Sequence, residues 1–283
     1  MWKIKRSGFA DEIDPDLTKQ IQVLKKCSIN YVEMRGVNGK GLVEHSLAEA
    51  KEVKKQLHGE GIRLSAIGSP IGKIKITDEF EPHMELYKHT VELAHEMETP
   101  LIRMFSFFMP EGEDYTPFRG KVMERLGRFV DYAKENQVVL LHENEKDIYG
   151  DKADRCLELM KEFYGEHFKA VFDFANFVQC RQDTLDAYEM LKPYIAYIHV
   201  KDALWADGSV VPAGYGDGNV EKILGMLKKS GYEGFLSLEP HLADFTGFHA
   251  LEKQGAEKKK LSGEEAFILA HKALTEILSK TGI

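Results

Sequence analysis

The stretch VVLLHENE, residues 138–145, joins a fully apolar segment to a cluster of polar and ionisable side chains. Four aliphatic residues in a row are typical of a strand that is buried on both faces, as in a parallel sheet covered by helices. The next residues are His142, Glu143, Asn144 and Glu145, and a carboxylate is costly to bury without a partner. The stretch therefore predicts a buried strand that ends where its charge is neutralised.

The same pattern recurs along the chain, because short apolar segments alternate with longer ones whose apolar residues are three and four positions apart. This alternation is typical of strands and helices around a parallel sheet. Ser46 is expected to cap the second helix, and Gly61 and Gly231 lie where helices should end. The strand candidates are KRSGFA (5–10), YVEMR (31–35), RLSAIG (63–68), LIRMFSF (101–107), VVLLHEN (138–144), KAVFDF (169–174), AYIHVK (196–201) and FLSLEP (235–240).

Eight strand and helix pairs without a Pro/Gly/Ser-rich linker or a shift in composition favour one closed barrel over an open doubly wound sheet. The length of 283 residues and the hydrophobic content of 43% are sufficient for a large core. We therefore expect an α/β fold, a single (β/α)8 TIM barrel, formed by one domain over residues 1–283.

Four strand candidates end in a side chain that can bind a metal ion, namely Glu143, Asp173, His199 and Glu239. Chemistry in such barrels takes place at the C-terminal ends of the strands, where these residues should meet. Any one of them alone could be a surface charge or half of a salt bridge, but together they are tolerable if a divalent cation neutralises them. The oxygen-rich set without a thiolate predicts one divalent ion, with Mn²⁺, Mg²⁺ or Co²⁺ preferred over Zn²⁺.

Several motifs resemble the xylose isomerase-like TIM-barrel superfamily, in its sugar phosphate isomerase/epimerase branch. They are GFADEI (8–13), LLHENE (140–145), VFDFANF (171–177), YIHVKD (197–202), VPAGYGDGNV (211–220) and LSLEPHL (236–242). The resemblance covers essentially the whole chain. It implies a metal site at the same four strand ends, with Glu143 and Glu239 also acting as the catalytic acid and base.

Two departures from the epimerases of that superfamily concern the substrate. Those enzymes usually carry a histidine at the position of Asn176, and they place a substrate-binding arginine in the region of Trp205. The resemblance therefore implies the metal site more directly than it implies the identity of the substrate.

The expected reaction is isomerisation or epimerisation of a small sugar or sugar derivative. A proton is removed next to a carbonyl, and the cation stabilises the resulting enediolate as a Lewis acid. Two glutamates on opposite faces would invert the carbon, whereas transfer on one face would interconvert an aldose and a ketose. The alternatives are a dehydratase of a keto-inositol or sugar acid and a sugar-binding barrel without turnover. A DNA-repair endonuclease with three zinc ions would need additional histidine ligands.

Further polar residues close to these strand ends are candidates for contact with the substrate, although each could equally serve in an ion pair or in packing. Glu12, Glu33 and Arg35 are expected to line the same pocket. The glycine-rich GYGDGN (214–219) precedes a helix, so it predicts either a phosphate cradle or a tight turn. The substrate-binding candidates are Arg103, Lys201, Asp202, His241, Glu145, Asn176 and Trp205.

The composition limits which binding partners and which cellular compartment we expect for the protein. The net charge of −8 disfavours nucleic acid, which needs a basic surface. Three cysteines far apart in the sequence favour reduced thiols, and neither a signal peptide nor an apolar run long enough for a membrane span is visible. We therefore expect a cytoplasmic protein with a small carbohydrate substrate and no membrane partner. A homo-oligomer is possible in this family.

Overall fold

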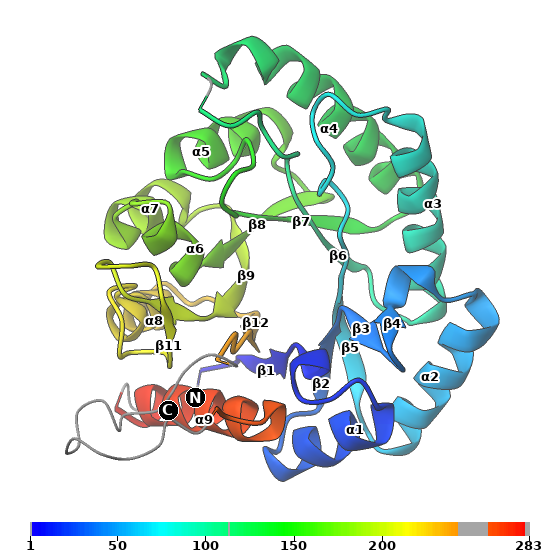
Figure 1. Cartoon of the computed structure of the whole chain (residues 1–283), viewed down its shortest axis with the longest axis vertical. Helices are drawn as coiled ribbons and strands as arrows, with labels where there is room; N and C mark the ends of the chain where they lie inside the picture. Colours follow the sequence, from blue (N-terminus) through cyan, green and yellow to red (C-terminus); the bar gives the residue numbers. More distant parts are fainter. Residues whose placement is uncertain (1, 113, 243–259, 281–283) are drawn as a thin grey trace.

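The computed structural model describes residues 2–112, 114–242 and 260–280, in which eight parallel strands form a nearly closed barrel (Figure 1). The hydrogen-bonded order is β1-β12-β9-β8-β7-β6-β5-β2, and its two end strands, β1 and β2, lie side by side. The fold is thus the expected (β/α)8 TIM barrel. The strands are β1 (Lys5–Gly8), β2 (Tyr31–Met34), β5 (Arg63–Gly68), β6 (Leu101–Met104), β7 (Val139–Glu143), β8 (Phe168–Asp173), β9 (Ile195–Val200) and β12 (Phe235–Leu238).

Helices surround the ring of strands and cover its outer face (Figure 1). The strand β8 is followed by two short helices, α6 and α7, where the sequence pattern predicts one helix. The helices are α1 (Leu17–Lys26), α2 (Leu47–Gly59), α3 (Glu81–Glu96), α4 (Arg119–Glu135), α5 (Ala153–Phe163), α6 (Phe174–Gln179), α7 (Thr184–Leu191), α8 (Val220–Lys229) and α9 (Gly263–Lys280).

Several short elements lie in the loops between these strands and helices. The short helices are η1 (Ala10–Glu12), η2 (Leu42–Glu44) and η3 (Thr116–Phe118). Two small hairpins pair β3 (Gly36–Val37) with β4 (Lys40–Gly41) and β10 (Asp202–Ala203) with β11 (Val210–Val211).

Local signals in the sequence explain where the helices begin and end. Ser46 caps α2 through a reciprocal pair of hydrogen bonds with Glu49, as expected for a capping box. Gly61 and Gly231 follow α2 and α8 with φ angles of 75° and 77°, which glycine adopts without steric cost. The predicted strand 101–107 is three residues too long, because β6 ends at Met104 and Phe107 has a φ of 69°.

The largest apolar core fills the space between the strands and the helices. A smaller cluster of Ala66, Leu141, Val171 and Tyr197 fills the inside of the barrel. Since the centre of the barrel is packed with side chains, a ligand can reach it only from an open end.

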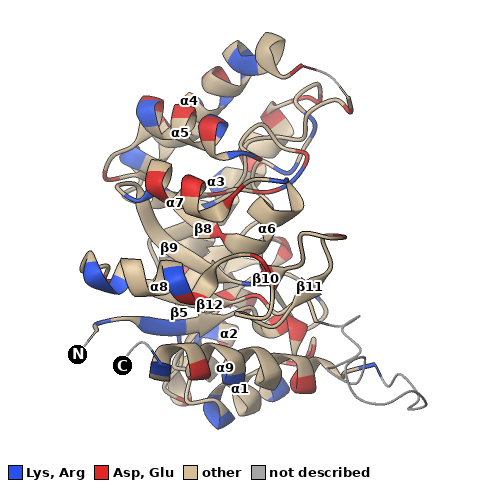
Figure 2. Ribbon diagram, turned by 90° about the vertical axis from the view of Figure 1, so that its left-hand side faces the viewer, with Lys and Arg blue, Asp and Glu red and all other residues tan. Residues whose placement is uncertain are grey.

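The outer helices carry Lys and Arg interspersed with Asp and Glu, which is the pattern of a solvated surface (Figure 2). Within the described residues, none of the helices combines the length and the apolar character that crossing a bilayer would require.

Candidate metal centre

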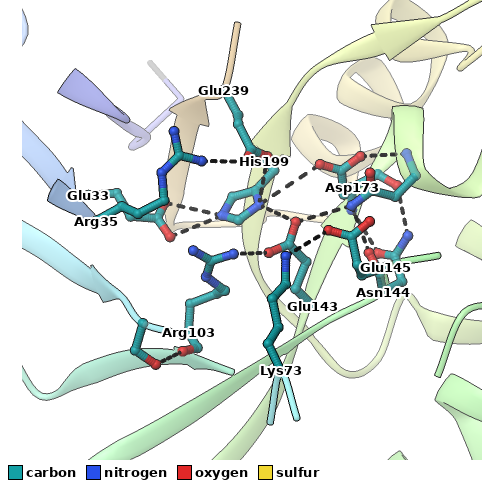
Figure 3. A network of polar contacts seen from close by, with 12 residues as sticks. Glu33, Arg35, Lys73, Arg103, Glu143, Asn144, Glu145, Asp173, His199 and Glu239 are labelled. Atoms are coloured by element: carbon teal, nitrogen blue, oxygen red, sulfur yellow. Dashed lines mark hydrogen bonds and ion pairs between the residues drawn. The ribbon is translucent and has the colours of Figure 1, made fainter. Parts of the chain in front are cut away.

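Four side chains from four neighbouring strands meet at the C-terminal end of the barrel (Figure 3). Glu143 and Asp173 are the last residues of β7 and β8, His199 is near the end of β9, and Glu239 follows β12 directly. Each offers one ligand atom, and these atoms lie within 4.8 Å of one another. All four side chains are buried, so the barrel brings together the residues that the sequence predicts as ligands.

The imidazole of His199 shows which atoms face the common centre. Its Nδ1 lies 2.9 Å from Oε1 of Glu143, 3.6 Å from Oε2 of Glu239 and 3.9 Å from Oδ2 of Asp173. Its Nε2 lies 3.1 Å from both carboxylate oxygens of Glu33, a fully buried residue of β2. Glu33 therefore accepts the Nε2 proton and keeps Nδ1 directed at the three oxygens, as carboxylates often do for metal-binding histidines.

Two buried cations accompany the carboxylates. Nη1 of Arg103, on β6, donates to Oε2 of Glu143 at 2.9 Å. Nζ of Lys201, which follows β9, lies 2.9 Å from Oε2 of Glu239 and 3.2 Å from Oδ2 of Asp173. These contacts help the barrel to hold several carboxylates in its interior.

Burial tends to raise the pKa of all three carboxylates, but neighbouring charges make the net shifts of their pKa values differ. At Glu143 burial is the largest single influence, but His199 and Arg103 together outweigh it and hold the pKa below its usual range. At Glu239 burial again raises the pKa, but Lys201, His241 and His199 together hold it well below the usual value. At Asp173 burial dominates, so its pKa is raised even though Lys201 pulls it down. Asp173 is therefore the ligand candidate that takes up a proton most readily.

The pKa of His199 is raised well above its usual value. Burial alone would lower it, but the carboxylates of Glu143 and Glu33 on either side of the ring outweigh burial. The two carboxylates therefore favour the charged form of the imidazole.

The arrangement fits a divalent cation. Buried acceptor atoms in proteins nearly always have a hydrogen-bond partner. Oδ2 of Asp173 is buried without one, because the nearby ammonium of Lys201 does not meet hydrogen-bond geometry. This oxygen is also one of the three that lie near Nδ1 of His199. Three carboxylates and one imidazole suit divalent ions, so these four residues could hold one.

A second group lies at the rim, where Glu239 turns its other oxygen outward. Oε1 of Glu239 lies 3.3 Å from Nε2 of His241 and 3.4 Å from Nη1 of Arg35. Both cationic side chains also contact Glu12, and the backbone N–H of His241 donates to Glu12 at 2.6 Å. Glu12, Arg35 and His241 thus surround the outward oxygen of Glu239, and a role of these residues toward a substrate stays a prediction.

Helix α6, after β8, and the loop after β7 place two further predicted residues next to the centre, Asn176 and Glu145 respectively. Asn176 donates through Nδ2 to Oε1 of Glu143 at 3.2 Å. Glu145 pairs with Lys73 at 3.2 Å between Oε2 and Nζ (Figure 3), and the ammonium of Lys73 lies 4.2 Å from the ring centre of Phe105. The sequence analysis does not single out Lys73, although this lysine follows the strand candidate 63–68 within five residues.

Asp202 is directed away from the centre and into the glycine-rich loop. Its carboxylate accepts backbone N–H groups from Ala203, Gly214, Gly216 and Gly218. A Cβ atom on Gly216 or Gly218 would collide with Asp202, so the glycines allow the close approach. The donors that could cradle a phosphate are therefore engaged by a side chain of the same chain.

Trp205 lies in the same loop, with 40% of its surface exposed. Its backbone carbonyl accepts from Arg181, and its ring contacts the guanidinium of that arginine. Trp205 does not belong to the cluster of metal-ligand candidates.

Comparison with known protein families matches residues 21–262 to a model described as xylose isomerase-like TIM barrel. A 3-dehydroshikimate dehydratase of Bacillus anthracis is 22% identical over 191 residues, which are 67% of this chain and 68% of that protein. An uncharacterized protein, YihM of Escherichia coli, is 36% identical over only 53 residues, which are 19% of this chain and 16% of its own length.

Solved structures of similar fold include a protein with a bound zinc atom, IOLI. It has a TM-score of 0.75 and 16% identity, and the match covers 98% of this chain and 99% of that one. A D-tagatose 3-epimerase-like protein has a TM-score of 0.73 and 16% identity, with coverage of 99% and 100%. At these identities the likeness establishes the fold.

Proposed function

Because the chain belongs to the xylose isomerase-like TIM barrel family, we propose that it is a divalent-metal-dependent isomerase or epimerase of a small sugar or sugar derivative. The observation that carries this proposal is the meeting of Glu143, Asp173, His199 and Glu239 within 4.8 Å at the C-terminal end of the barrel. The fold shared with a D-tagatose 3-epimerase-like protein supports it.

The proposed cofactor is one divalent ion held by these four residues, with Mn²⁺, Mg²⁺ or Co²⁺ preferred over Zn²⁺. When bound, such an ion supplies Lewis-acid polarisation of a substrate carbonyl and orients the substrate. The zinc atom in IOLI, a protein of the same fold, supports the presence of a metal but leaves the preferred ion to experiment.

Glu143 and Glu239 are the proposed acid and base. Oε1 of Glu143 and Oε2 of Glu239 lie 2.9 Å and 3.6 Å from the same nitrogen of His199, so both carboxylates face one space. One removes the proton next to the carbonyl, and the other returns a proton to the opposite face, which inverts the carbon. Transfer by one glutamate on a single face would instead move the carbonyl along the chain of the sugar.

The two glutamates differ in how close they lie to the rim of the barrel. Glu143 receives hydrogen bonds from Arg103 and Asn176 and contacts His199, whereas the outward oxygen of Glu239 faces the half-exposed His241 at the rim. Glu239 is therefore the better placed of the two to exchange its proton with solvent. The fixed position of Glu143 suits a group that must meet one face of the substrate.

The remaining side chains around the centre are the proposed substrate contacts. They offer both donors and acceptors, as recognition of a polyhydroxylated ligand requires. Asp202 and Trp205 are not assigned to the substrate, because their contacts lie within the glycine-rich loop. The proposed contacts are Arg103, Glu145, Asn176, Lys201 and His241.

A dehydratase is the second candidate, and the similarity over two thirds of the chain to a 3-dehydroshikimate dehydratase favours it. Both reactions begin with removal of a proton next to a carbonyl by a carboxylate. They differ in the next step, because a dehydratase expels a hydroxyl from the neighbouring carbon and its product has lost the mass of one water.

The test is incorporation of deuterium. The protein is incubated with Mn²⁺ and a panel of ketoses, keto-inositols and sugar acids in D₂O, and products are analysed by NMR and mass spectrometry. An isomerase or epimerase places deuterium on carbon without loss of water. A binding protein shows saturable binding without deuterium, and this result would refute the proposal.

Variants connect the activity to the site. Glu143→Gln and Glu239→Gln should each reduce incorporation by at least about 100-fold, because each removes a proton-transferring group. Glu60→Gln, which changes an exposed residue that pairs with Lys25, is the matched control and should retain full activity.

A further inference from the structure

The ammonium of Lys201 contacts two of the carboxylates that are proposed to bind the metal ion. This lysine follows β9, two residues after His199, and only 3% of its side chain is exposed. Its ammonium lies 2.9 Å from Oε2 of Glu239 and 3.2 Å from Oδ2 of Asp173. A buried ammonium requires such partners, because an unpaired buried charge is strongly destabilising.

The two oxygens that Lys201 contacts are two of the three carboxylate oxygens that lie near Nδ1 of His199. Oε2 of Glu239 and Oδ2 of Asp173 lie 3.6 Å and 3.9 Å from that nitrogen. They are thus the atoms that a metal ion bound by His199 would share. The other nearby cation, Arg103, contacts the second oxygen of Glu143 and leaves Oε1 to face the centre.

A lysine and a divalent ion use these oxygens in different ways. Divalent ions bind carboxylate oxygens at about 2.0–2.6 Å, which is closer than the ammonium lies. Their charge also repels an ammonium a few ångströms away, and the low dielectric of the interior strengthens this repulsion. The ion gains from Asp173 in particular, since Oδ2 of that residue has no hydrogen bond to lose.

We propose that Lys201 is an internal counter-cation that competes with the metal ion for Asp173 and Glu239 and thereby sets the metal affinity of the site. Metal binding displaces the ammonium from both oxygens. The carboxylate of Glu145 also attracts this ammonium and would offer it a partner after displacement. Lys201 is thus a positioning residue whose contacts depend on whether the metal is bound. This inference rests on the metal site of the proposed function.

The experiment measures metal affinity rather than activity. Chelator-treated wild-type protein and the Lys201→Met, Lys201→Arg and Lys73→Met variants are titrated with Mn²⁺ by calorimetry at one pH. Lys201→Met should bind Mn²⁺ at least about tenfold more tightly than wild type, because the competing charge is gone. Lys201→Arg keeps the charge and should stay within about threefold. Lys73→Met should do so too, because Lys73 pairs with Glu145 outside the ligand set.

Unchanged or weaker binding by Lys201→Met would overturn the proposal. Binding by Lys201→Met when wild type binds no ion supports it, whereas no binding by either chain overturns both this inference and the proposed metal site. If Lys201→Met does not fold without metal, a crystal structure of Mn²⁺-loaded wild type decides the question. The ammonium should then lie beyond hydrogen-bond distance from Asp173 and Glu239, and retention of both contacts beside the ion contradicts competition.

The outcomes also separate this inference from the proposed reaction. Tighter binding by Lys201→Met without deuterium incorporation by wild type would support the inference and refute the enzyme. Deuterium incorporation by wild type, with no change in Mn²⁺ affinity in Lys201→Met, would support the enzyme and overturn the inference.

Discussion

Asp202→Asn tests what the carboxylate of Asp202 does in this fold. Oδ1 accepts the backbone N–H of Ala203 and Gly218 at 2.9 Å each. Oδ2 accepts those of Gly214 at 2.9 Å and Gly216 at 3.1 Å. An asparagine has one acceptor oxygen, so either orientation of its amide turns an NH₂ group toward two backbone donors.

The size of the effect follows from those two donors. An unsatisfied buried donor costs about 1–3 kcal/mol, so Asp202→Asn should lower the free energy of unfolding by about 2–6 kcal/mol. Asp207→Asn is the matched control. Asp207 is exposed, and it accepts one backbone N–H from another residue, that of Ser209. We expect that control to remain within about 0.5 kcal/mol of wild type.

Urea unfolding followed by circular dichroism measures the stability, and hydrogen exchange measures protection of the amides of Gly214, Gly216 and Gly218. These amides should exchange faster in Asp202→Asn than in wild type. A variant of wild-type stability with protected glycine amides would refute the structural role. If that variant had also lost turnover, Asp202 would be a substrate contact, as the sequence analysis predicts.

Three further predictions concern stability and reactivity. Burial lowers the pKa of His142 and of His83 to about 4. Both imidazoles are neutral in the folded protein but take up a proton near pH 6.5 in the unfolded chain. Each therefore contributes up to about 3 kcal/mol to the free energy of unfolding above pH 6.5, and this contribution is lost as the pH falls toward 4. The urea concentration at the unfolding midpoint should fall as the pH is lowered through this range, and it should fall less steeply in His83→Gln than in wild type. Equal dependence on pH in the two proteins would contradict a neutral, buried His83. Gly72→Ala should lower the unfolding free energy by about 2–6 kcal/mol, because φ is 88° and the new Cβ would overlap the backbone of Phe105; a thermal melt unchanged from wild type would show that this backbone can move. Burial raises the pKa of Cys180 to about 12, so iodoacetamide at about pH 8 should alkylate it roughly 1000-fold more slowly in the folded protein than in urea, and equal rates would refute this.

The barrel could be predicted from the sequence because its signals are local. Apolar runs of strand length, helical spacing between them, and residues such as Ser46 and Gly61 each act within a few positions along the chain. One strand boundary depends on a contact between distant segments, which local signals do not reveal. The strand at 101–107 ends early because, after Met104, the backbone N–H groups of Phe105 and Phe107 donate to Ile71 and Gly72 in the segment that follows β5.

The four ligand candidates were also predictable, since strand ends converge in any closed barrel. Glu143 and His199 are 56 residues apart in sequence, yet both end apolar runs, and that position alone predicts their meeting. Asp202 shows the limit of this reasoning, because it lies beside the same strand end but turns into the glycine-rich loop. Nothing in the local pattern reveals the direction of its side chain.

The sequence by itself thus determined the architecture and the chemical types gathered at one end of it. The tertiary structure alone decided how those groups are paired. Glu33 reaches Nε2 of His199 across 166 residues of sequence, and Lys201 inserts its ammonium between Asp173 and Glu239. The physical reason is that alternation along a strand fixes the side on which a side chain lies, whereas hydrogen bonds and ion pairs depend on distances of a few ångströms between strands, which only the packed barrel sets.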